Sequence, residues 1–326
     1  MAEEKKAFLS VRDLEVVYTS GGETIRAVNK VSFDLERGKT LGLVGETGAG
    51  KTTIARSILR ILPDPPAKVL GGEVWFDGQE LLNAPESEML KIRGDKIAMI
   101  FQDPMTALNP LMTVGDQILE GLLLHNNYTR EEGRRKAEEM LETVGIPKER
   151  YVEYPFEFSG GMKQRVVIAM ALACSPLLLL ADEPTTALDV TIQAQVLDLI
   201  RDMKDKYDAA MILITHDLGV IAETCDNVAV VYAGQIVEMG DKKDIFVDRA
   251  HPYTQGLFNS LPNIHDKSPR LKPIDGSMPD PANLPDGCYF SPRCPYATEA
   301  CNTGEIPLTE ITPGHWCRCC NLKREV

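Results

Sequence analysis

The fold of this chain is decided by residues 40–53, which read Thr40-Leu41-Gly42-Leu43-Val44-Gly45-Glu46-Thr47-Gly48-Ala49-Gly50-Lys51-Thr52-Thr53. Residues 40–45 form a short apolar run, which is typical of a buried parallel strand. Residues 45–52 fit the pattern G-x-x-x-x-G-K-[ST], and residues 53–62 predict a helix that ends before Pro63. Because a strand precedes the glycine loop and a helix follows it, the segment predicts a phosphate-binding loop rather than a chance turn.

The residue types at positions 45–53 suit the binding of a nucleoside triphosphate. Glycines allow backbone N–H groups to converge on phosphate oxygens, and the N-terminus of the following helix adds positive potential. We expect Lys51 to neutralise the β- and γ-phosphates and the Thr52 hydroxyl to bind Mg²⁺. The chain is therefore expected to bind ATP together with Mg²⁺.

A second acidic site follows another buried strand. Residues 177–181 are Leu-Leu-Leu-Leu-Ala, and Asp182 and Glu183 come directly after them. Alone, an Asp-Glu pair after a strand signals a helix start about as often as a site. Beside a phosphate loop we expect Asp182 to bind Mg²⁺ and Glu183 to orient or deprotonate the attacking water.

The pattern of the whole chain favours an α/β fold. Strands predicted at residues 40–45, 96–101, 177–182, 210–215 and 228–232 alternate with helical segments. The helical segments lie within residues 53–62, 113–174 and from about 190 onward. Such alternation predicts a parallel sheet core, and residues 8–35 add β-rich segments joined by a Gly21-Gly22 turn.

Composition and charge exclude several classes of function. The formal net charge is −13 over 326 residues, so we expect no binding of nucleic acid by bulk electrostatics. Residues 1–6 contain no apolar stretch, so we expect no signal peptide. The longest apolar region, residues 166–181, is interrupted by Ser175 and Pro176 and is too short to span a bilayer.

Six of the eight cysteines crowd the last 39 residues, in a proline-rich segment that begins near His251. In a reducing compartment such a cluster favours a metal over disulfides. No C-x-x-C pair begins the set, so its spacing does not match usual structural zinc sites and suits an iron–sulfur cluster better. Zinc and ligand-free or disulfide-bonded thiols remain alternatives.

Residues 158–165, Phe-Ser-Gly-Gly-Met-Lys-Gln-Arg, resemble the signature motif of ABC-type ATPases. Other positions match that family in order and spacing. Gln102 and His216 each follow a predicted strand, and residues 187–189 read Ala-Leu-Asp. Tyr18 lies in the N-terminal β-rich region. The resemblance covers residues 8–250. It implies a RecA-like parallel-sheet ATPase core, an N-terminal antiparallel β subdomain and a helical subdomain over residues 104–174.

The resemblance also implies roles. Two such domains pair head to tail, and each ATP lies between one phosphate loop and the other subunit's signature motif. It implies that Ser159, Gly160 and Gly161 contact the partner's nucleotide and that Asp189 lines the dimer seam. Gln102 is implied to sense Mg²⁺ and the attacking water, His216 to bind the γ-phosphate, and Tyr18 to stack on adenine. Met162 and Phe158 stand where the signature motif more commonly has Gln and Leu. These departures narrow the choice of subfamily within the family.

Three further segments resemble the ATP-binding subunits of oligopeptide, dipeptide and nickel importers: residues 101–110, 251–257 and 287–295. The family tail ends His-x-x-x-Cys, which here matches His315 and Cys319. The expectation is therefore a 4Fe–4S cluster bound by Cys288, Cys294, Cys301 and Cys319, with Cys317 or Cys320 as replacements for Cys319. Residues 1–250 would form the ATPase domain and residues 251–326 a loop-rich C-terminal extension.

The resemblance implies a subunit that energises import of dipeptides or oligopeptides at the cytoplasmic face of the membrane. Its implied partners are a second ATPase subunit (an identical copy or a paralogue), integral membrane permease subunits and, indirectly, an extracytoplasmic peptide-binding protein. A nickel importer of the same subfamily is one alternative. A soluble ABC ATPase acting on DNA or ribosomes, and an iron–sulfur sensor with a secondary ATPase, are the others.

Overall fold

The computed structural model describes residues 7–185, 190–260 and 273–322 of the chain. The chain forms two compact units. The first unit comprises residues 1–35, 41–82 and 216–326, and the second comprises residues 36–40 and 83–215. Each unit has its own buried apolar core.

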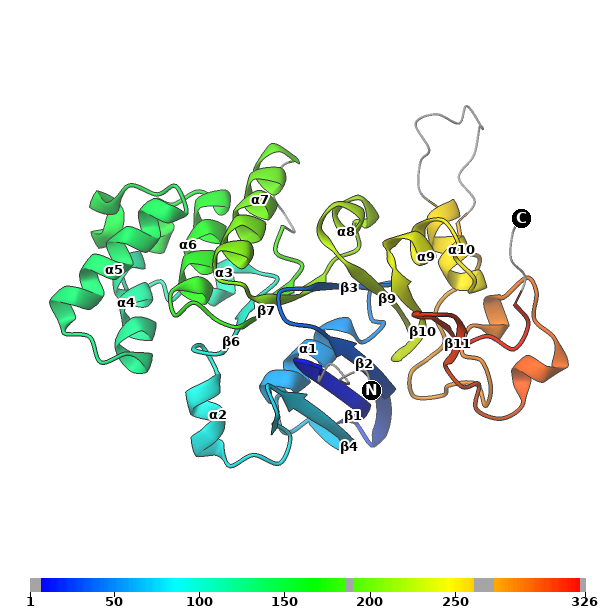
Figure 1. Cartoon of the computed structure of the whole chain (residues 1–326). Coiled ribbons are helices and arrows are strands. Elements are labelled where there is room, and N and C mark those ends of the chain that lie inside the picture. Colours follow the sequence, from blue (N-terminus) through cyan, green and yellow to red (C-terminus); the bar gives the residue numbers. More distant parts are fainter. Residues whose placement is uncertain (1–6, 186–189, 261–272, 323–326) are drawn as a thin grey trace, which may run out of the picture. The chain divides into compact units, whose positions relative to one another are not determined.

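The first unit contains an antiparallel sheet built from the β-rich N-terminal residues. Its strand order is β2-β1-β4-β5, and β1 pairs with both β2 and β4 (Figure 1). The apolar residues of β1 are fully buried in two alternating pairs, Leu9 with Val11 and Leu14 with Val16, and the strand register shifts between them. The bounds are β1 Leu9–Ser20, β2 Glu23–Leu35, β4 Ala67–Phe76 and β5 Gln79–Glu80.

A second set of strands in the first unit follows the order β11-β12-β10-β9-β3. Only β3 and β9 are parallel, and the other neighbours are antiparallel. Every residue of β3 is buried, as the apolar run at residues 40–45 predicts. The bounds are β3 Thr40–Val44, β9 Asn227–Tyr232, β10 Gln235–Asp241, β11 Thr309–Thr312 and β12 His315–Cys317.

The second unit contains parallel strands in the order β8-β7-β6. All residues of these strands are buried, which explains their nearly continuous apolar sequences. Helices make up most of the rest of this unit (Figure 1). The strand bounds are β6 Ile97–Ile100, β7 Leu178–Asp182 and β8 Ala210–Ile214.

The helix bounds follow local signals in the sequence. In the first unit α1 ends at Leu59, earlier than predicted, because Arg60 adopts a left-handed conformation and its N–H caps the helix. The first-unit helices are α1 Lys51–Leu59, α8 Leu218–Thr224, α9 Lys242–Phe246 and α10 Pro252–Asn259. The second-unit helices are α2 Glu86–Ile92, α3 Pro104–Ala107, α4 Val114–His125, α5 Arg130–Thr143, α6 Gly160–Leu172 and α7 Val190–Lys206.

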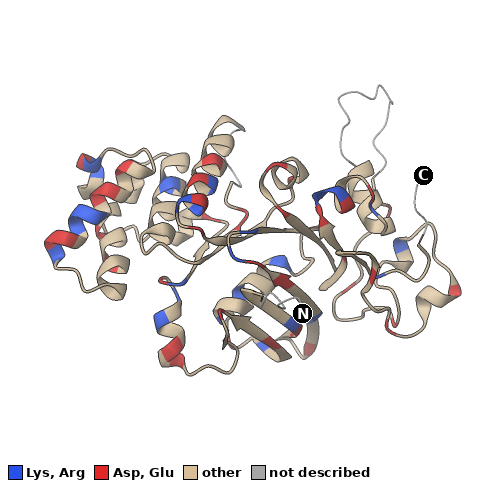
Figure 2. Cartoon of the chain, viewed as in Figure 1, with Lys and Arg blue, Asp and Glu red and all other residues tan. Residues whose placement is uncertain are grey.

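Helix α5 illustrates how the surface helices are stabilised. Thr129 and Glu132 form a capping box at its start. Charges of both signs alternate along the helix, and Arg134 pairs with Glu138 and Lys136 with Glu139 (Figure 2). Such exposed pairs contribute little each, and they keep this face of the helix in water.

The architecture confirms the predicted α/β fold class, with a parallel-sheet core, an antiparallel N-terminal β subdomain, a helical segment and a loop-rich C-terminal extension. Within residues 7–185, 190–260 and 273–322, no helix combines the length and apolar character needed to cross a bilayer.

Candidate nucleotide site

The predicted phosphate loop connects β3 to α1 in the first unit. Gly45, Gly48 and Gly50 all have φ in the left-handed region, at 152°, 82° and 102°. A Cβ atom at Gly45 would lie 2.1 Å from the Val231 carbonyl oxygen, and one at Gly50 would lie 2.3 Å from that of Ala27. The two glycines are therefore required both by backbone conformation and by close approach of neighbouring backbone.

Lys51 lies across this loop. Its Nζ atom donates hydrogen bonds to the carbonyl oxygens of Gly45, at 2.8 Å, and Glu46, at 3.0 Å. Gly50 is the N-cap residue of α1 and has no side chain that could occupy the anion position at the start of the helix. A cradle of glycines, one lysine and a helix N-terminus fits a nucleotide phosphate.

Neighbouring elements of the first unit support the loop. The Gly234 N–H donates to the Ala49 carbonyl oxygen at 2.9 Å, and the Asn29 N–H donates to the Gly234 carbonyl oxygen at 2.8 Å. The predicted adenine-stacking residue, Tyr18, lies on β1 with its hydroxyl 3.3 Å from the Thr53 hydroxyl. The last contact places the Tyr18 hydroxyl beside Thr53, in the first turn of α1.

Glu183 and Gln102 meet in the second unit, although 81 residues separate them. Gln102 Nε2 donates to Glu183 Oε2 at 2.9 Å. Glu183 has φ of 46°, a left-handed conformation that is uncommon for a residue with a side chain. Its own N–H donates to the Ile214 carbonyl oxygen at the end of β8. The two residues thus form a polar pair at the carboxyl ends of parallel strands, where α/β sheets place their sites.

The signature segment begins α6 in the second unit. Ser159 is the N-cap residue, and its hydroxyl accepts the Met162 N–H. A Cβ atom at Gly160 would contact nothing within 4 Å, whereas one at Gly161 would lie 2.9 Å from Ile192 Cγ2. Buried Gln164 donates to the Pro184 carbonyl oxygen at 2.6 Å, so α6 is bonded to the residue that follows Glu183.

The remaining predicted residues divide between the units. Asp182 ends β7 and is buried in the second unit, while exposed His216 precedes α8 in the first unit. Asp189 lies outside the described residues.

Comparison with known proteins identifies the family. A family profile described as "ABC transporter" matches residues 28–186, and one described as "Oligopeptide/dipeptide transporter, C-terminal region" matches residues 237–301. The dipeptide transport ATP-binding protein DppD of Bacillus subtilis is 51% identical over 313 residues, which cover 95% of this chain and 93% of that protein. The chain belongs to the ATP-binding proteins of oligopeptide and dipeptide ABC transporters.

Two more comparisons support this family. The oligopeptide transport ATP-binding protein OppD of Escherichia coli is 46% identical over 319 residues, covering 97% of this chain and 94% of that protein. The dimeric, post-hydrolysis structure of the ATP-binding cassette MJ0796, bound to ADP and Pi, is 28% identical with a TM-score of 0.65. It covers 72% of this chain and 98% of that cassette. The resemblance read from the sequence is confirmed, and this family member is an ABC-type ATPase.

The predicted 4Fe–4S cluster at Cys288, Cys294, Cys301 and Cys319 is wrong. Among the described residues, no three or more His, Cys, Asp or Glu side chains are arranged to hold a metal ion, which speaks equally against the zinc alternative.

The cysteines of the extension lie near one another and near backbone N–H groups. Cys301 Sγ lies 3.4 Å from Cys320 Sγ and accepts the Thr298 N–H, while Cys319 Sγ accepts the Asn321 N–H. Burial raises the pKa of the Cys288 thiol to about 11.

Two side chains that the sequence did not single out complete the surroundings of the phosphate loop. Arg293 and Tyr253, both from the C-terminal extension, contact Glu46 in the loop. The available signal was weak: Arg293 lies within residues 287–295 and Tyr253 within residues 251–257, the segments that mark the family, but neither residue type suggested a loop contact. Only the folded chain brings residues 46 and 293 together.

Proposed function

We propose that this chain hydrolyses ATP to energise an ABC importer for dipeptides or oligopeptides. The observation that carries the proposal is the Gln102–Glu183 pair at the ends of buried parallel strands, in a chain whose other unit holds an intact phosphate loop. The relatives named above carry dipeptide or oligopeptide transport in their names, which favours peptide over nickel as the cargo. Residues 1–250 would be the ATPase domain, with a helical subdomain at 104–174, and residues 251–326 the extension.

The proposed roles follow from the chemistry of each side chain. Lys51 and the N–H groups of residues 45–53 bind the phosphates, and Tyr18 packs against the adenine. Thr52 and Asp182 would hold Mg²⁺, which supplies charge neutralisation between phosphate oxygens when bound. Glu183 accepts the proton of the attacking water, Gln102 orients Glu183 and that water, and His216 contacts the γ-phosphate.

A second ATPase subunit is proposed to complete each site. Ser159, Gly160 and Gly161 would contact the nucleotide of that partner, and Asp189 would line the seam. The N-terminus of the 13-residue helix α6 suits an anion, and Gly160 leaves space for one. The dimeric state of MJ0796 with bound ADP and Pi supports this arrangement for a similar cassette.

Membrane permease subunits are the other proposed partners, with the chain peripheral on the cytoplasmic side and an extracytoplasmic peptide-binding protein acting indirectly. Large apolar side chains of the second unit that reach solvent support such docking. Among them are Leu111 at 85%, Leu124 at 75%, Phe156 at 73%, Leu90 at 61% and Met105 at 60% exposed.

The test is to purify the chain with its membrane subunits, reconstitute the complex in vesicles, and measure ATP hydrolysis and peptide uptake. We expect Glu183→Gln to keep ATP binding and to lower both rates by roughly a hundredfold or more, because removing a positioned base costs about 10²–10⁴ in rate. Glu299→Gln, at an exposed position in the short 3-10 helix Glu299–Asn302 of the extension, is the matched control. Wild-type hydrolysis in Glu183→Gln, or hydrolysis without peptide uptake in the wild type, would refute the proposal.

A further inference from the structure

We propose that Arg293, in the C-terminal extension, is a positioning residue that holds the phosphate loop in its nucleotide-binding form by neutralising Glu46. The inference rests on the proposed function, because it concerns how ATP is bound at that loop. Through Arg293, the C-terminal extension would increase the affinity of the phosphate loop for ATP.

The contact joins residues 247 positions apart in the first unit. Arg293 Nη1 lies 3.1 Å from both carboxylate oxygens of Glu46 and 3.3 Å from the Tyr232 hydroxyl. The Arg293 side chain is only 6% exposed and that of Glu46 is 30% exposed. Because the arginine is nearly buried, the pair is screened less than one between two exposed side chains.

Three different groups of Glu46 are engaged. Its carboxylate binds Arg293, its N–H donates to the Tyr253 hydroxyl at 3.0 Å, and its carbonyl oxygen accepts from Lys51 Nζ at 3.0 Å. Arg293 and Tyr253 both belong to the extension. The extension therefore holds the same residue whose carbonyl group holds the phosphate-binding lysine.

Charge explains why this contact matters for ATP. Glu46 places a carboxylate within a loop built to attract anions, and an uncompensated negative charge there would repel a triphosphate. Arg293 removes that repulsion.

Met278 is a further residue of the extension beside the loop. A Cβ atom added at Gly48 would lie 3.4 Å from the Met278 methyl carbon.

Arg293 is itself held in place, so its position does not depend on Glu46 alone. Its Nε donates to the Asp275 carbonyl oxygen at 2.9 Å and Nη2 to that of Ile274 at 3.4 Å. The guanidinium also lies near the rings of Tyr232 and Phe290, 5.8 and 6.0 Å from their centroids. A planar group fixed at several points can hold a carboxylate at small entropic cost.

The experiment measures the Kd for Mg-ATP of the full-length chain by titration, for the wild type and variants. We expect Arg293→Ala to raise Kd by about tenfold, which corresponds to about 1.4 kcal/mol. Arg293→Lys should recover part of the loss. The double variant Glu46→Gln/Arg293→Ala should recover most of it, because the repelling charge is then gone.

Lys30→Ala is the matched control. Lys30 pairs with Glu305 and so also joins the body of the first unit to the extension, but both side chains are about half exposed. We expect the Lys30→Ala variant to bind Mg-ATP with the Kd of the wild type.

Two outcomes would overturn the proposal. Either Arg293→Ala binds ATP as the wild type does, or it binds weakly and Glu46→Gln gives no recovery, which would mean that Arg293 only keeps the extension folded. A wild-type chain that does not bind ATP would instead refute the proposed function.

Discussion

At the scale of single residues, left-handed backbone conformations occur in both of the segments that are proposed to act on ATP. Gly45 and Gly50 adopt left-handed angles in the phosphate loop, and Glu183 adopts one although it carries a side chain. A left-handed non-glycine residue costs about 1–3 kcal/mol and persists only where the surroundings hold it. The Glu183 N–H bond to Ile214 and the Gln102 bond to the Glu183 carboxylate are two of the contacts that do so.

We predict that Gly50→Ala weakens ATP binding by roughly five- to hundredfold. The new methyl group would lie 2.3 Å from the Ala27 carbonyl oxygen at a φ of 102°, so the loop must move. Strain of about 1–3 kcal/mol at such a site corresponds to roughly a five- to hundredfold effect. Titration of the variant and the wild type with Mg-ATP measures the change in Kd.

Gly71→Ala is the control for this substitution, because its Cβ would meet nothing within 4 Å and its φ is ordinary. Equal ATP affinity in the two variants would contradict the steric account of the loop.

At the scale of elements, the first turn of α10 depends on a histidine. The His251 ring accepts the Tyr253 N–H through Nδ1 at 3.0 Å, and its backbone N–H donates to Glu238. Burial lowers the pKa of His251 to about 4, with opposing Coulombic attraction from Glu238. The helix is thus capped by a neutral ring, and it carries Tyr253 to Glu46.

We predict that the wild type loses stability as pH falls from 6.5 towards 4. In that window unfolded His251 binds a proton and folded His251 does not, so unfolding is favoured by up to about 3 kcal/mol. His251→Asn keeps a capping acceptor but does not titrate, so its stability should fall less over this range. Urea unfolding at pH 7 and pH 4.5 checks this, and identical losses in both proteins would contradict it.

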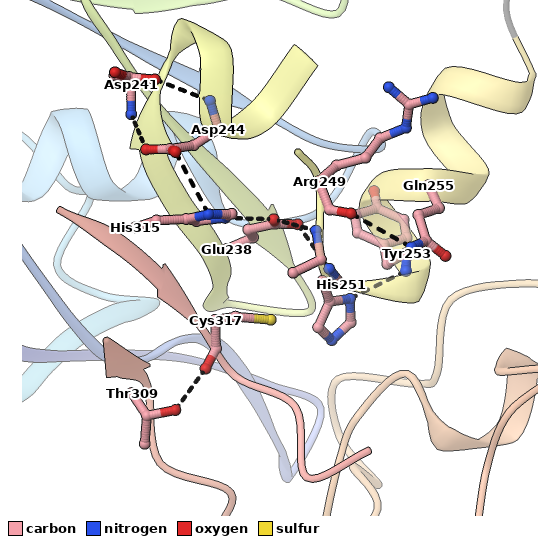
Figure 3. A network of polar contacts seen from close by, with 11 residues as sticks. Glu238, Asp241, Asp244, Arg249, His251, Tyr253, Gln255, Thr309, His315 and Cys317 are labelled. Atoms are coloured by element: carbon pink, nitrogen blue, oxygen red, sulfur yellow. Dashed lines mark hydrogen bonds and ion pairs between the residues drawn. The ribbon is translucent and has the colours of Figure 1, made fainter. Parts of the chain in front are cut away.

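At the scale of the whole molecule, the C-terminal extension is part of the first unit and shares its core. Strand β12 pairs with β10, and the Glu238 carboxylate, which is fully buried, accepts from the Ala250 and His251 N–H groups. Glu238 also lies 2.8 Å from His315 Nε2 on β12 (Figure 3). Two histidines of the extension, His251 and His315, are thus hydrogen-bonded to one buried carboxylate of the first unit.

We predict that His315→Ala destabilises the folded chain by about 1.5–3 kcal/mol, because it removes a hydrogen-bond partner from a buried carboxylate. Chemical unfolding gives the free energy of unfolding. Lys30→Ala, which breaks an exposed contact to the same extension, serves as the control and should change it little. Equal effects of the two substitutions would argue against a buried anchoring role for His315.

The fold was largely predictable because its signals are local. The apolar strands of the two units, the N-cap at Ser159 and the glycine loop each arise from residues close together in the chain. The sequence was misleading for the cysteines, since thiol spacing says nothing about how deeply each sulfur is buried or what it contacts.

By itself, the sequence determined the phosphate loop, the alternation of strands and helices, and the family, because these depend on residue type at fixed short spacing. Only the tertiary structure decided that Glu46 meets Arg293 and Tyr253, that Gln102 meets Glu183, and that His315 binds Glu238. The physical reason is that each of these contacts joins distant segments. Their distance and burial follow from how whole elements pack, not from the residues beside them in the chain.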